Sequence, residues 1–278
     1  MAQHIPLSIS YAQRSDIGMQ RRFNEDTSVV HEMTLPNKRR VVIAAVADGM
    51  GGAQAGAEAS HLAVGTAVQT LAARLQEIVP SSEGQWQEAL CHALHTANNA
   101  VHARSHTRRQ FNGMGTTLLL SALYERRVRI AHIGDCRAYM VRPAARKPHI
   151  IQLTADHTVV AELIGRGAIS HADATTHPQR HQLARTLGQE PQIEPELTAR
   201  NLRTGERLVL CSDGLPLHVA DYEVARTISD APTPQAACDR LVELANQRGG
   251  RDNVTVVIIA ADRHQPLVST QPPTRLEV

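Results

Sequence analysis

Four aspartates stand at the ends of apolar segments that are typical of buried strands, and three of them adjoin a glycine. They are Asp48 after residues 41–47, Asp135 after 128–133, Asp213 after 208–212 and Asp252 before 254–261. Aspartate has a poor strand propensity and is costly to bury without a partner. A single aspartate in such a place is commonly a turn residue or a helix cap. Four are harder to explain by turns, which favours a shared site at one end of a sheet.

The chemistry of these side chains indicates a hard divalent cation. Clustered carboxylates repel one another unless a cation lies between them, and oxygen ligands suit Mg²⁺ or Mn²⁺ rather than zinc or copper. The flanking glycines let the backbone come close, so a carbonyl can serve as a further ligand. The segment Asn24-Glu25-Asp26 adds two carboxylates and an amide, and Arg21 lies four residues before Glu25. An arginine beside an acidic metal site is what a phosphate substrate requires.

The composition excludes several other functions. The 278 residues are 42% hydrophobic and 20% charged, which is ordinary for a globular protein and argues against extensive disorder. The formal net charge of +2 offers no electrostatic case for binding nucleic acid or a membrane surface. Aromatic residues make up only 3%, which disfavours stacking platforms for single-stranded nucleic acid. We therefore expect an aliphatic core.

The cysteines and the apolar runs predict a cytoplasmic protein. None of the four cysteines forms a C-x-x-C pair, which disfavours structural zinc or a redox dithiol. We recognise no secretory signal, and no apolar run approaches the roughly 20 residues needed to span a bilayer. Reduced thiols and a cytoplasmic location are the expectation. Cys211 lies inside a strand and is expected to be a small buried hydrophobe.

The hydrophobic pattern predicts an α+β fold. Helices are expected at 56–79, 85–106, 221–228 and 233–247, and strands near 7–11, 27–33, 41–47, 116–123, 128–133, 137–142, 149–153, 208–212 and 254–261. Hairpins and grouped helices differ from the strand–helix alternation of a doubly wound sheet. We therefore expect helices that cover antiparallel sheets, within one domain that spans residues 1–261.

Two segments stand apart from this expected core. Residues 158–188 combine short helical pieces, several histidines and three glycines, and they are interpreted as an insertion or flap. Residues 262–278 carry three prolines and few apolar residues. This composition predicts a disordered C-terminal tail.

Seven short motifs follow one another in an order that typifies one enzyme family. They are Arg21-x-x-Asn24-Glu25-Asp26, Asp48-Gly-Met-Gly-Gly52, Gly115-Thr-Thr117, Ala131-His-Ile-Gly134-Asp135-Cys-Arg137, Leu153-Thr-Ala-Asp156-His157, Ser212-Asp213-Gly-Leu215 and Asp252-Asn253. Together they resemble the metal-dependent Ser/Thr protein phosphatases of type 2C, the PPM family, in the bacterial form. The resemblance covers roughly residues 10–261, and seven motifs in order are very specific.

The resemblance implies a four-layer α-β-β-α sandwich, in which helices flank two antiparallel sheets and two or three Mn²⁺ or Mg²⁺ ions lie at one end. It also implies a role for each matching residue. Asp48 would bridge two ions, and the first of these would also be held by the Gly49 carbonyl, Asp213 and Asp252. Glu25 would act on the second ion, and Asp135 with Asp213 would hold a third. Arg21 would bind phosphate, while Asp26 and Asn253 would orient the ligands.

The implied chemistry is hydrolysis of phosphoserine or phosphothreonine by a water that the cations activate, with no phosphoenzyme. Arg21, Asp48 and Asp213 are the catalytic residues in this interpretation.

One position departs from the family pattern, because Met50 stands where some relatives have a histidine that can serve as general acid. The sequence does not choose among His132, His157 and a water bound to the metals as the proton donor. The histidines of the flap, His181 among them, are interpreted as solvated.

The expected function is to oppose bacterial Ser/Thr kinases, as a monomer whose substrates are phosphoproteins such as a kinase or its targets. One alternative is a catalytically silent pseudophosphatase that binds a partner. Such a protein is expected to have lost Asp48, Asp213 or Asp252, and all three are present. The other alternative is a hydrolase of small phosphoesters or nucleotides, which would use the same chemistry. Comparing the turnover of phosphopeptides and nucleotides discriminates between the two enzymes.

Overall fold

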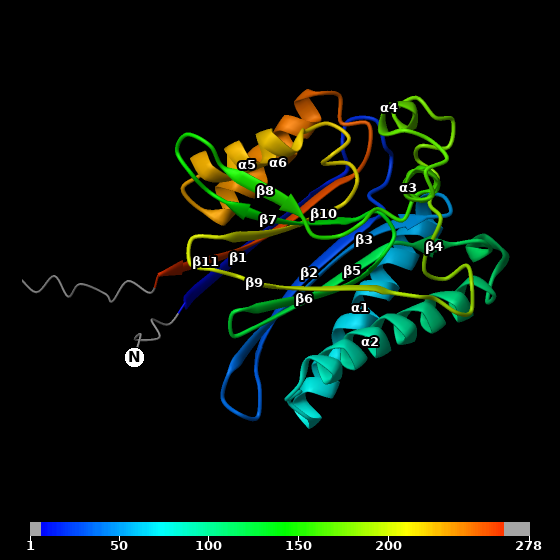
Figure 1. Cartoon of the computed structure of the whole chain (residues 1–278). Coiled ribbons are helices and arrows are strands. Elements are labelled where there is room, and N and C mark those ends of the chain that lie inside the picture. Colours follow the sequence, from blue (N-terminus) through cyan, green and yellow to red (C-terminus); the bar gives the residue numbers. More distant parts are fainter. Residues whose placement is uncertain (1–6, 264–278) are drawn as a thin grey trace, which may run out of the picture.

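Two antiparallel β-sheets packed face to face form the centre of the computed structural model, which describes residues 7–263 (Figure 1). The first sheet has the order β1-β11-β10-β7-β8, with β1 at Leu7–Asp16, β7 at Arg137–Arg142, β8 at His149–Gln152, β10 at Arg207–Cys211 and β11 at Val254–Arg263. The second has the order β2-β3-β5-β6-β9, with β2 at Asp26–Thr34, β3 at Arg40–Met50, β5 at Leu118–Tyr124, β6 at Arg127–Ile133 and β9 at Glu196–Asn201. The short β4, Gly115–Thr116, pairs with the end of β3.

Two pairs of helices form the outer layers. The helices α1 (Ala53–Glu77) and α2 (Glu83–Ser105) cover the second sheet, and α5 (Asp221–Asp230) and α6 (Pro234–Gln247) cover the first. The short α3 (Val159–Gly165) and α4 (His171–Ala174) lie at the end of the sandwich where β4 pairs with β3, and η1 is a single turn at Arg109–Phe111 (Figure 1). The expected four-layer α-β-β-α sandwich is confirmed.

The continuous apolar runs of the sequence follow from burial on both faces of each sheet. In β3, Ile43 and Ala45 pack against the outer helices, whereas Val42, Ala44 and Val46 pack against the opposite sheet. Residues of β11 divide in the same way between the α5–α6 layer and the middle of the sandwich. Because both sides of a central strand are apolar, its sequence shows no alternation. The result is a set of rigid strands whose ends are fixed in space.

Most expected elements are present, with several differences in extent, and strand β1 runs to Asp16, beyond the expected end at residue 11. Strand β3 continues through Asp48 to Met50, beyond the expected end at residue 47. Strand β9 was not expected, because its residues are polar and only partly buried. Strand β11 runs to Arg263, so the chain stays ordered two residues beyond the expected domain end at 261. The rest of the expected tail, residues 264–278, lies outside the described residues.

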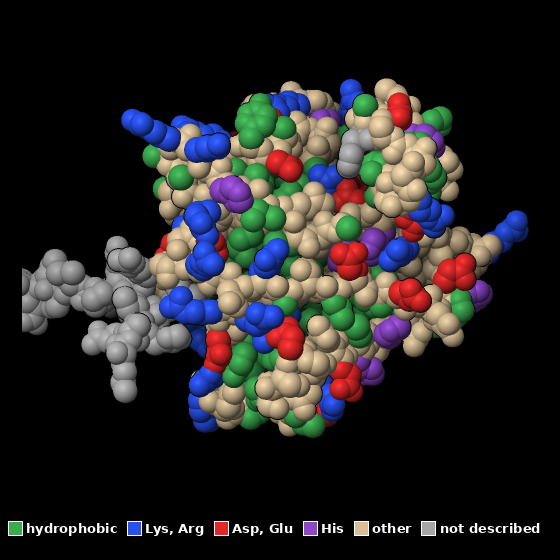
Figure 2. Space-filling view, viewed as in Figure 1, with side chains coloured by type: hydrophobic (Ala, Val, Ile, Leu, Met, Phe, Trp, Pro, Cys, Tyr) green, Lys and Arg blue, Asp and Glu red, His purple; other side chains and the backbone are tan. Residues whose placement is uncertain are grey.

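Other expectations from composition can be compared directly. All four cysteines are free, and Cys211 is buried in the core as expected. Across residues 7–263, no helix has the length and apolar character needed to cross a membrane. Basic and acidic side chains both occur across the face shown in Figure 2, in keeping with the small net charge.

The topology brings distant segments to one end of the sandwich. The loop of residues 17–25 passes there from β1 to β2, and the segment 134–136 passes there from β6 to β7. Asp26 opens β2 directly opposite Asp48 of β3. The end of β10 and the start of β11 are neighbours, because these two strands pair antiparallel. The strand-end aspartates of the sequence therefore converge.

A buried asparagine holds the chain where the segment 158–188 returns toward β9. Asn98 of α2 is fully buried, its Oδ1 accepts from the Gly188 N–H at 2.8 Å, and its Nδ2 donates to the carbonyls of Glu190 and Pro191 at 2.9 and 3.3 Å. We predict that Asn98→Ala lowers the free energy of unfolding by about 2 kcal/mol, because three backbone groups lose their partner. Urea unfolding measures this change, and Asn99→Ala at the exposed neighbour is the control. Equal effects of the two substitutions would contradict the assignment.

Candidate functional site

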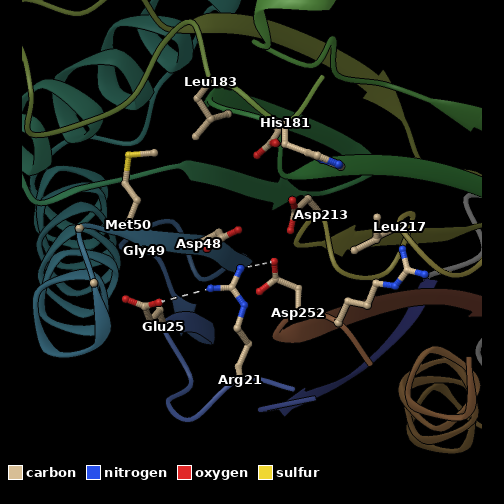
Figure 3. Close-up of a pocket in the computed structure, with 14 residues that line it drawn as sticks. Arg21, Glu25, Asp48, Gly49, Met50, His181, Leu183, Asp213, Leu217 and Asp252 are labelled. Carbon is tan, nitrogen blue, oxygen red and sulfur yellow. Dashed lines mark hydrogen bonds and ion pairs between the residues drawn. The ribbon is translucent and has the colours of Figure 1, made fainter. Parts of the chain in front are cut away.

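An acidic pocket of about 570 Å³ opens at this end of the sandwich (Figure 3). Its lining includes every residue that the sequence analysis proposed for metal or phosphate, namely Arg21, Glu25, Asp48, Gly49, Asp135, Asp213 and Asp252. These residues come from the 17–25 loop, the end of β3, the β6–β7 connection, the end of β10 and the start of β11. The structure therefore brings the whole predicted set together.

Hydrogen bonds with two threonines hold the backbone of Asp48 in place. Its N–H donates to Thr117 Oγ1 at 2.8 Å. Its carbonyl accepts from the Thr117 N–H at 2.9 Å and from Thr116 Oγ1 at 2.8 Å. Thr116 at the end of β4 and Thr117 before β5 thus fix the strand at the point where the Asp48 side chain enters the pocket.

Gly49 lies where no side chain fits. A Cβ at this position would lie 2.0 Å from the Gly56 carbonyl oxygen and 2.9 Å from that of Glu25. The Gly49 N–H donates to the same Glu25 carbonyl at 3.1 Å. Because position 49 is a glycine, the first turn of α1 and the Glu25 backbone both lie against β3. This contact places the Glu25 side chain beside that of Asp48.

Asp26 connects the two sheets beneath the pocket. Its Oδ2 accepts hydrogen bonds from Ser212 Oγ and Thr255 Oγ1, both at 2.7 Å, and the side chain is buried. Ser212 directly precedes Asp213, so this pair of bonds fixes the end of β10 against the start of β2. Asp26 does not line the pocket, and it holds in place the backbone that carries Asp213.

Asn253 fixes the 17–25 loop. Its Oδ1 accepts from the Glu25 N–H at 2.8 Å, and its Nδ2 donates to the carbonyls of Ile17 and Phe23 at 2.9 and 3.0 Å. The side chain is buried and all three bonds go to the backbone of the same loop. Loop residues between these anchor points, Arg21 among them, are therefore held against the start of β11.

Arg21 lies across the mouth of the pocket. Its Nη2 donates to Asp252 Oδ2 at 2.6 Å, and its Nη1 lies 4.0 Å from Glu25 Oε2 (Figure 3). The side chain remains half exposed. Asp252 and Glu25 thus aim a cationic group with several N–H donors into an otherwise acidic cavity. That arrangement suits a tetrahedral oxyanion such as phosphate.

Burial and mutual repulsion disfavour the charged forms of the pocket acids. Burial is the largest effect, and it raises the pKa of Asp135 to about 8 and that of Asp26 to about 7. The pKa of Asp48 rises well above its usual range because burial is reinforced by the surrounding aspartates. Burial also raises the pKa of Glu25 and Asp213, and the charge of Asp252 adds to both increases. Arg21 offsets only part of this effect, because its charge lowers the pKa of Glu25 and of Asp213 but both remain raised.

Three buried carboxylate oxygens indicate where a cation would fit. Glu25 Oε1, Asp26 Oδ1 and Asp213 Oδ1 have no hydrogen-bond partner within the part of the chain that the structure describes. A buried carboxylate oxygen without a donor is unfavourable unless a cation coordinates it or its neighbour. The donor set consists of carboxylate and carbonyl oxygens, which matches Mn²⁺ or Mg²⁺. The residues present therefore fit a divalent metal centre.

Two candidates for the proton donor lie away from the pocket. The rings of His132 and His157 stack with centroids 4.6 Å apart, and both side chains are buried. His157 Nδ1 accepts from the Gly134 N–H at 3.2 Å, and its backbone N–H donates to the Gly134 carbonyl at 3.1 Å. Neither ring lines the pocket. They support the turn before Asp135, and they do not reach a substrate phosphate.

His132, His157 and Glu196 are residue types that bind metals, but the position of the proton on His157 does not suit a metal. His132, His157 and Glu196 offer ligand atoms within 4.8 Å of one another. A neutral imidazole that accepts at Nδ1 carries its proton on Nε2, and His157 Nε2 lies 3.3 Å from Glu196 Oε2. His157 therefore donates to Glu196 and has no lone pair for a metal there.

Sequence reasoning missed part of the pocket wall. His181, Leu183, Leu217 and Arg251 all line the cavity. His181 is exposed, as a solvated flap histidine would be, but it also faces the acidic cluster (Figure 3). No spacing in the sequence indicates these positions, because they lie in irregular segments outside the motifs.

Comparison with known proteins gives consistent results. A family model described as protein phosphatase 2C matches residues 23–247. The chain is 37% identical over 255 residues to the serine/threonine protein phosphatase PstP of Mycobacterium tuberculosis, covering 91% of this chain and 45% of PstP. It is 34% identical over 253 residues to the serine/threonine phosphatase stp of Listeria monocytogenes, covering 91% of this chain and 96% of stp.

A solved structure agrees with the fold. The catalytic domain of PstP in complex with two manganese ions superposes with a TM-score of 0.75 at 34% identity, covering 92% of this chain and 99% of that one. A four-layer sandwich with an acidic pocket at the sheet ends defines the class of metal-dependent protein phosphatases. Within that class, the chain belongs to the protein phosphatase 2C family. It spans about half the length of the mycobacterial PstP that it matches.

The raised pKa of Asp135 predicts a pH-dependent stability of the chelator-treated protein. Because this pKa is about 8 in the folded chain and about 4 in the unfolded chain, the folded state binds more protons between these values. The stabilising contribution is present below about pH 4 and is lost as the pH rises through about 8. Between pH 6 and pH 8, the free energy of unfolding of the wild type should fall by about 2 kcal/mol more than that of Asp135→Asn. Urea titrations in chelator measure this difference, and identical pH profiles would contradict it.

Proposed function

We propose that this chain is a Mn²⁺- or Mg²⁺-dependent phosphatase that removes phosphate from phosphoserine and phosphothreonine in bacterial proteins. The observation that carries the proposal is the pocket itself. Five acidic residues and two arginines from five separate segments line a single cavity, and packing alone does not require such residues in any of these segments. The names of the mycobacterial and listerial relatives support a protein substrate.

We assign the metal ligands from the lining of the pocket. Asp48 stands in the middle of the acidic set, and with the Gly49 carbonyl, Asp213 and Asp252 it would hold a first ion. Asp48 and Glu25 would hold a second, and Asp135 with Asp213 would hold a third. The manganese complex of PstP, which contains two ions, supports a centre that holds at least two. Asp26 and Asn253 would orient these ligands through the bonds described above.

The residues of this chain bind and orient the phosphate. When bound, the cations supply positive charge to the phosphoryl oxygens and activate a water for attack on phosphorus. Arg21 would donate its N–H groups to the oxygens that face the mouth of the pocket, while Asp252 keeps its guanidinium in that position. The buried anchors of Glu25 and Asp48 keep the acidic groups from moving apart when the substrate binds.

The cysteines do not compete as nucleophiles. Burial raises the pKa of the Cys211 thiol to about 12 and that of Cys136 well above its usual range. A thiol that stays protonated and buried does not attack phosphorus. This supports direct hydrolysis by water, without a phosphoenzyme.

The proposal extends to partners and location. A Ser/Thr kinase or its targets would supply the phosphoprotein substrates, and the enzyme would act as a monomer in the cytoplasm. Four free cysteines support a reducing compartment. Between the alternatives, a pseudophosphatase is disfavoured because Asp48, Asp213 and Asp252 all line one pocket. A hydrolase of small phosphoesters remains the rival that substrate comparison tests.

We expect Asp213→Asn to lower kcat for an aryl phosphate or a phosphothreonine peptide by about 100-fold or more in Mn²⁺, because a ligand shared by two ions is lost. Addition of a chelator to the wild type should have the same effect. Asp239→Asn, at a partly buried aspartate of α6 that pairs with Arg14, is the matched control and should keep full activity. Steady-state kinetics measures both, and full activity of Asp213→Asn would refute the proposed function.

Phosphate binding by Arg21 makes a separate prediction. Arg21→Ala should lower kcat/KM for an aryl phosphate by roughly 10- to 100-fold, the effect of losing charge-assisted hydrogen bonds. The adjacent exposed Arg22→Ala should change it little. Comparable losses in the two variants would show that overall charge at the mouth, rather than the position of Arg21, attracts the substrate.

A further inference from the structure

The loop that carries Arg21 exposes several large hydrophobic side chains. Within residues 7–263, three large exposed hydrophobic residues, Ile17, Met19 and Phe23, lie in the loop that carries Arg21. Met19 is 68% exposed and Phe23 is 51% exposed. Single exposed hydrophobic residues are normal on a protein surface, but a group next to a functional site indicates a binding surface.

The loop holds these side chains on a fixed backbone. Asn253 anchors the carbonyls of Ile17 and Phe23, and the Met19 N–H donates to the Gly250 carbonyl at 2.7 Å. Because the backbone is already ordered, a ligand that covers these side chains has little loop entropy to overcome. The exposed group is therefore a preformed surface.

The pocket wall continues this apolar surface. Leu217, which is 38% exposed, lines the cavity, and its N–H donates to the Asp213 carbonyl at 3.0 Å. Met50 and Leu183 line it as well, and Figure 3 shows the three side chains spaced around the acidic groups. A charged floor is thus surrounded by apolar walls. The floor suits a phosphate and its cations, whereas the walls suit the parts of a substrate that carry no charge.

We propose that Ile17, Met19, Phe23 and Leu217, which we name the apolar rim, bind hydrophobic side chains that flank the phosphorylated residue of a protein substrate. This inference rests on the proposed function and defines its substrate class. Arg21 lies two residues from Met19 and from Phe23 in the same loop. A peptide whose phosphate reaches Arg21 therefore brings its neighbouring residues close to this loop. The occupant is a phosphorylated peptide segment with apolar neighbours.

The main rival is a substrate with acidic neighbours. Arg251 is exposed and lines the pocket, and the exposed Arg22 follows Arg21 in the same loop. An exposed guanidinium is well solvated, so pairing it with a carboxylate gains little. Covering an exposed Met or Phe removes apolar surface from water and gains more. The hydrophobic neighbour is therefore the favoured one.

Three phosphothreonine peptides of equal length test the proposal, with Leu, Gly or Asp on both sides of the phosphothreonine. With the full chain in Mn²⁺, the Leu peptide should have a kcat/KM about tenfold above that of the Gly peptide, expressed mainly in KM. In the double variant Met19→Ser with Phe23→Ser, this ratio should fall toward one. Leu217→Ser, as an independent variant on the opposite wall, should also lower it.

Two controls separate the rim from the catalytic site. Hydrolysis of a small aryl phosphate, which reaches only the phosphate position, should be unchanged in the double variant. Ile78→Ser, at a 52% exposed residue that caps the far end of α1, should keep the wild-type ratio. Equal kcat/KM for the Leu and Gly peptides, a faster Asp peptide, or an unchanged ratio in both rim variants would overturn the proposal. Hydrolysis of the aryl phosphate with no peptide hydrolysed at all would instead refute the proposed phosphoprotein function.

Discussion

Repulsion among buried carboxylates at one end of the sandwich is the constraint on which the rest of the structure depends. Five acidic side chains share a cavity, and burial disfavours the charged forms of Asp48 and Asp135 among them. They stay together because each lies in, or within two residues of, a strand of the packed sandwich, so their backbones cannot move apart. The fold opposes the repulsion by rigidity, and divalent cations would compensate the remaining charge. The small net charge of the chain conceals this local concentration of acid.

The polar groups behind the pocket have a second role, because they tie the two sheets to each other. Asp26 of one sheet receives hydroxyl bonds from residues next to β10 and in β11 of the other. Asn253, just before β11, binds the loop that leads into β2. Apolar packing between the sheets gives stability but little register, whereas these directional bonds fix the register at the end where the side chains meet. Structural and functional demands therefore fall on the same residues.

Much of the fold and the acidic set could be predicted from the sequence, for identifiable reasons. Continuous apolar runs such as residues 41–47 indicate strands buried on both faces, and Asp48, Asp213 and Asp252 are recognisable because acids at the ends of such runs conflict with burial. Strand β9 escaped prediction because an edge strand with polar, half-buried residues carries no pattern. The sequence left the proton donor open between His132, His157 and a water on the metals, because sequence does not show which way a ring points. The apolar rim was missed because exposed Met19 and Phe23 look like ordinary loop residues until their neighbours are known.

The central claim is that this end of the sandwich is a divalent metal centre built around Asp48. Equilibrium binding of Mn²⁺ to the chelator-treated chain, followed by titration calorimetry and by the electron paramagnetic resonance of free Mn²⁺, tests it without reference to activity. The account predicts that at least two Mn²⁺ ions bind per chain and that Asp48→Asn, which remains folded, loses at least one of them. Failure of the wild type to bind Mn²⁺, or the same stoichiometry and affinity in Asp48→Asn, would contradict it.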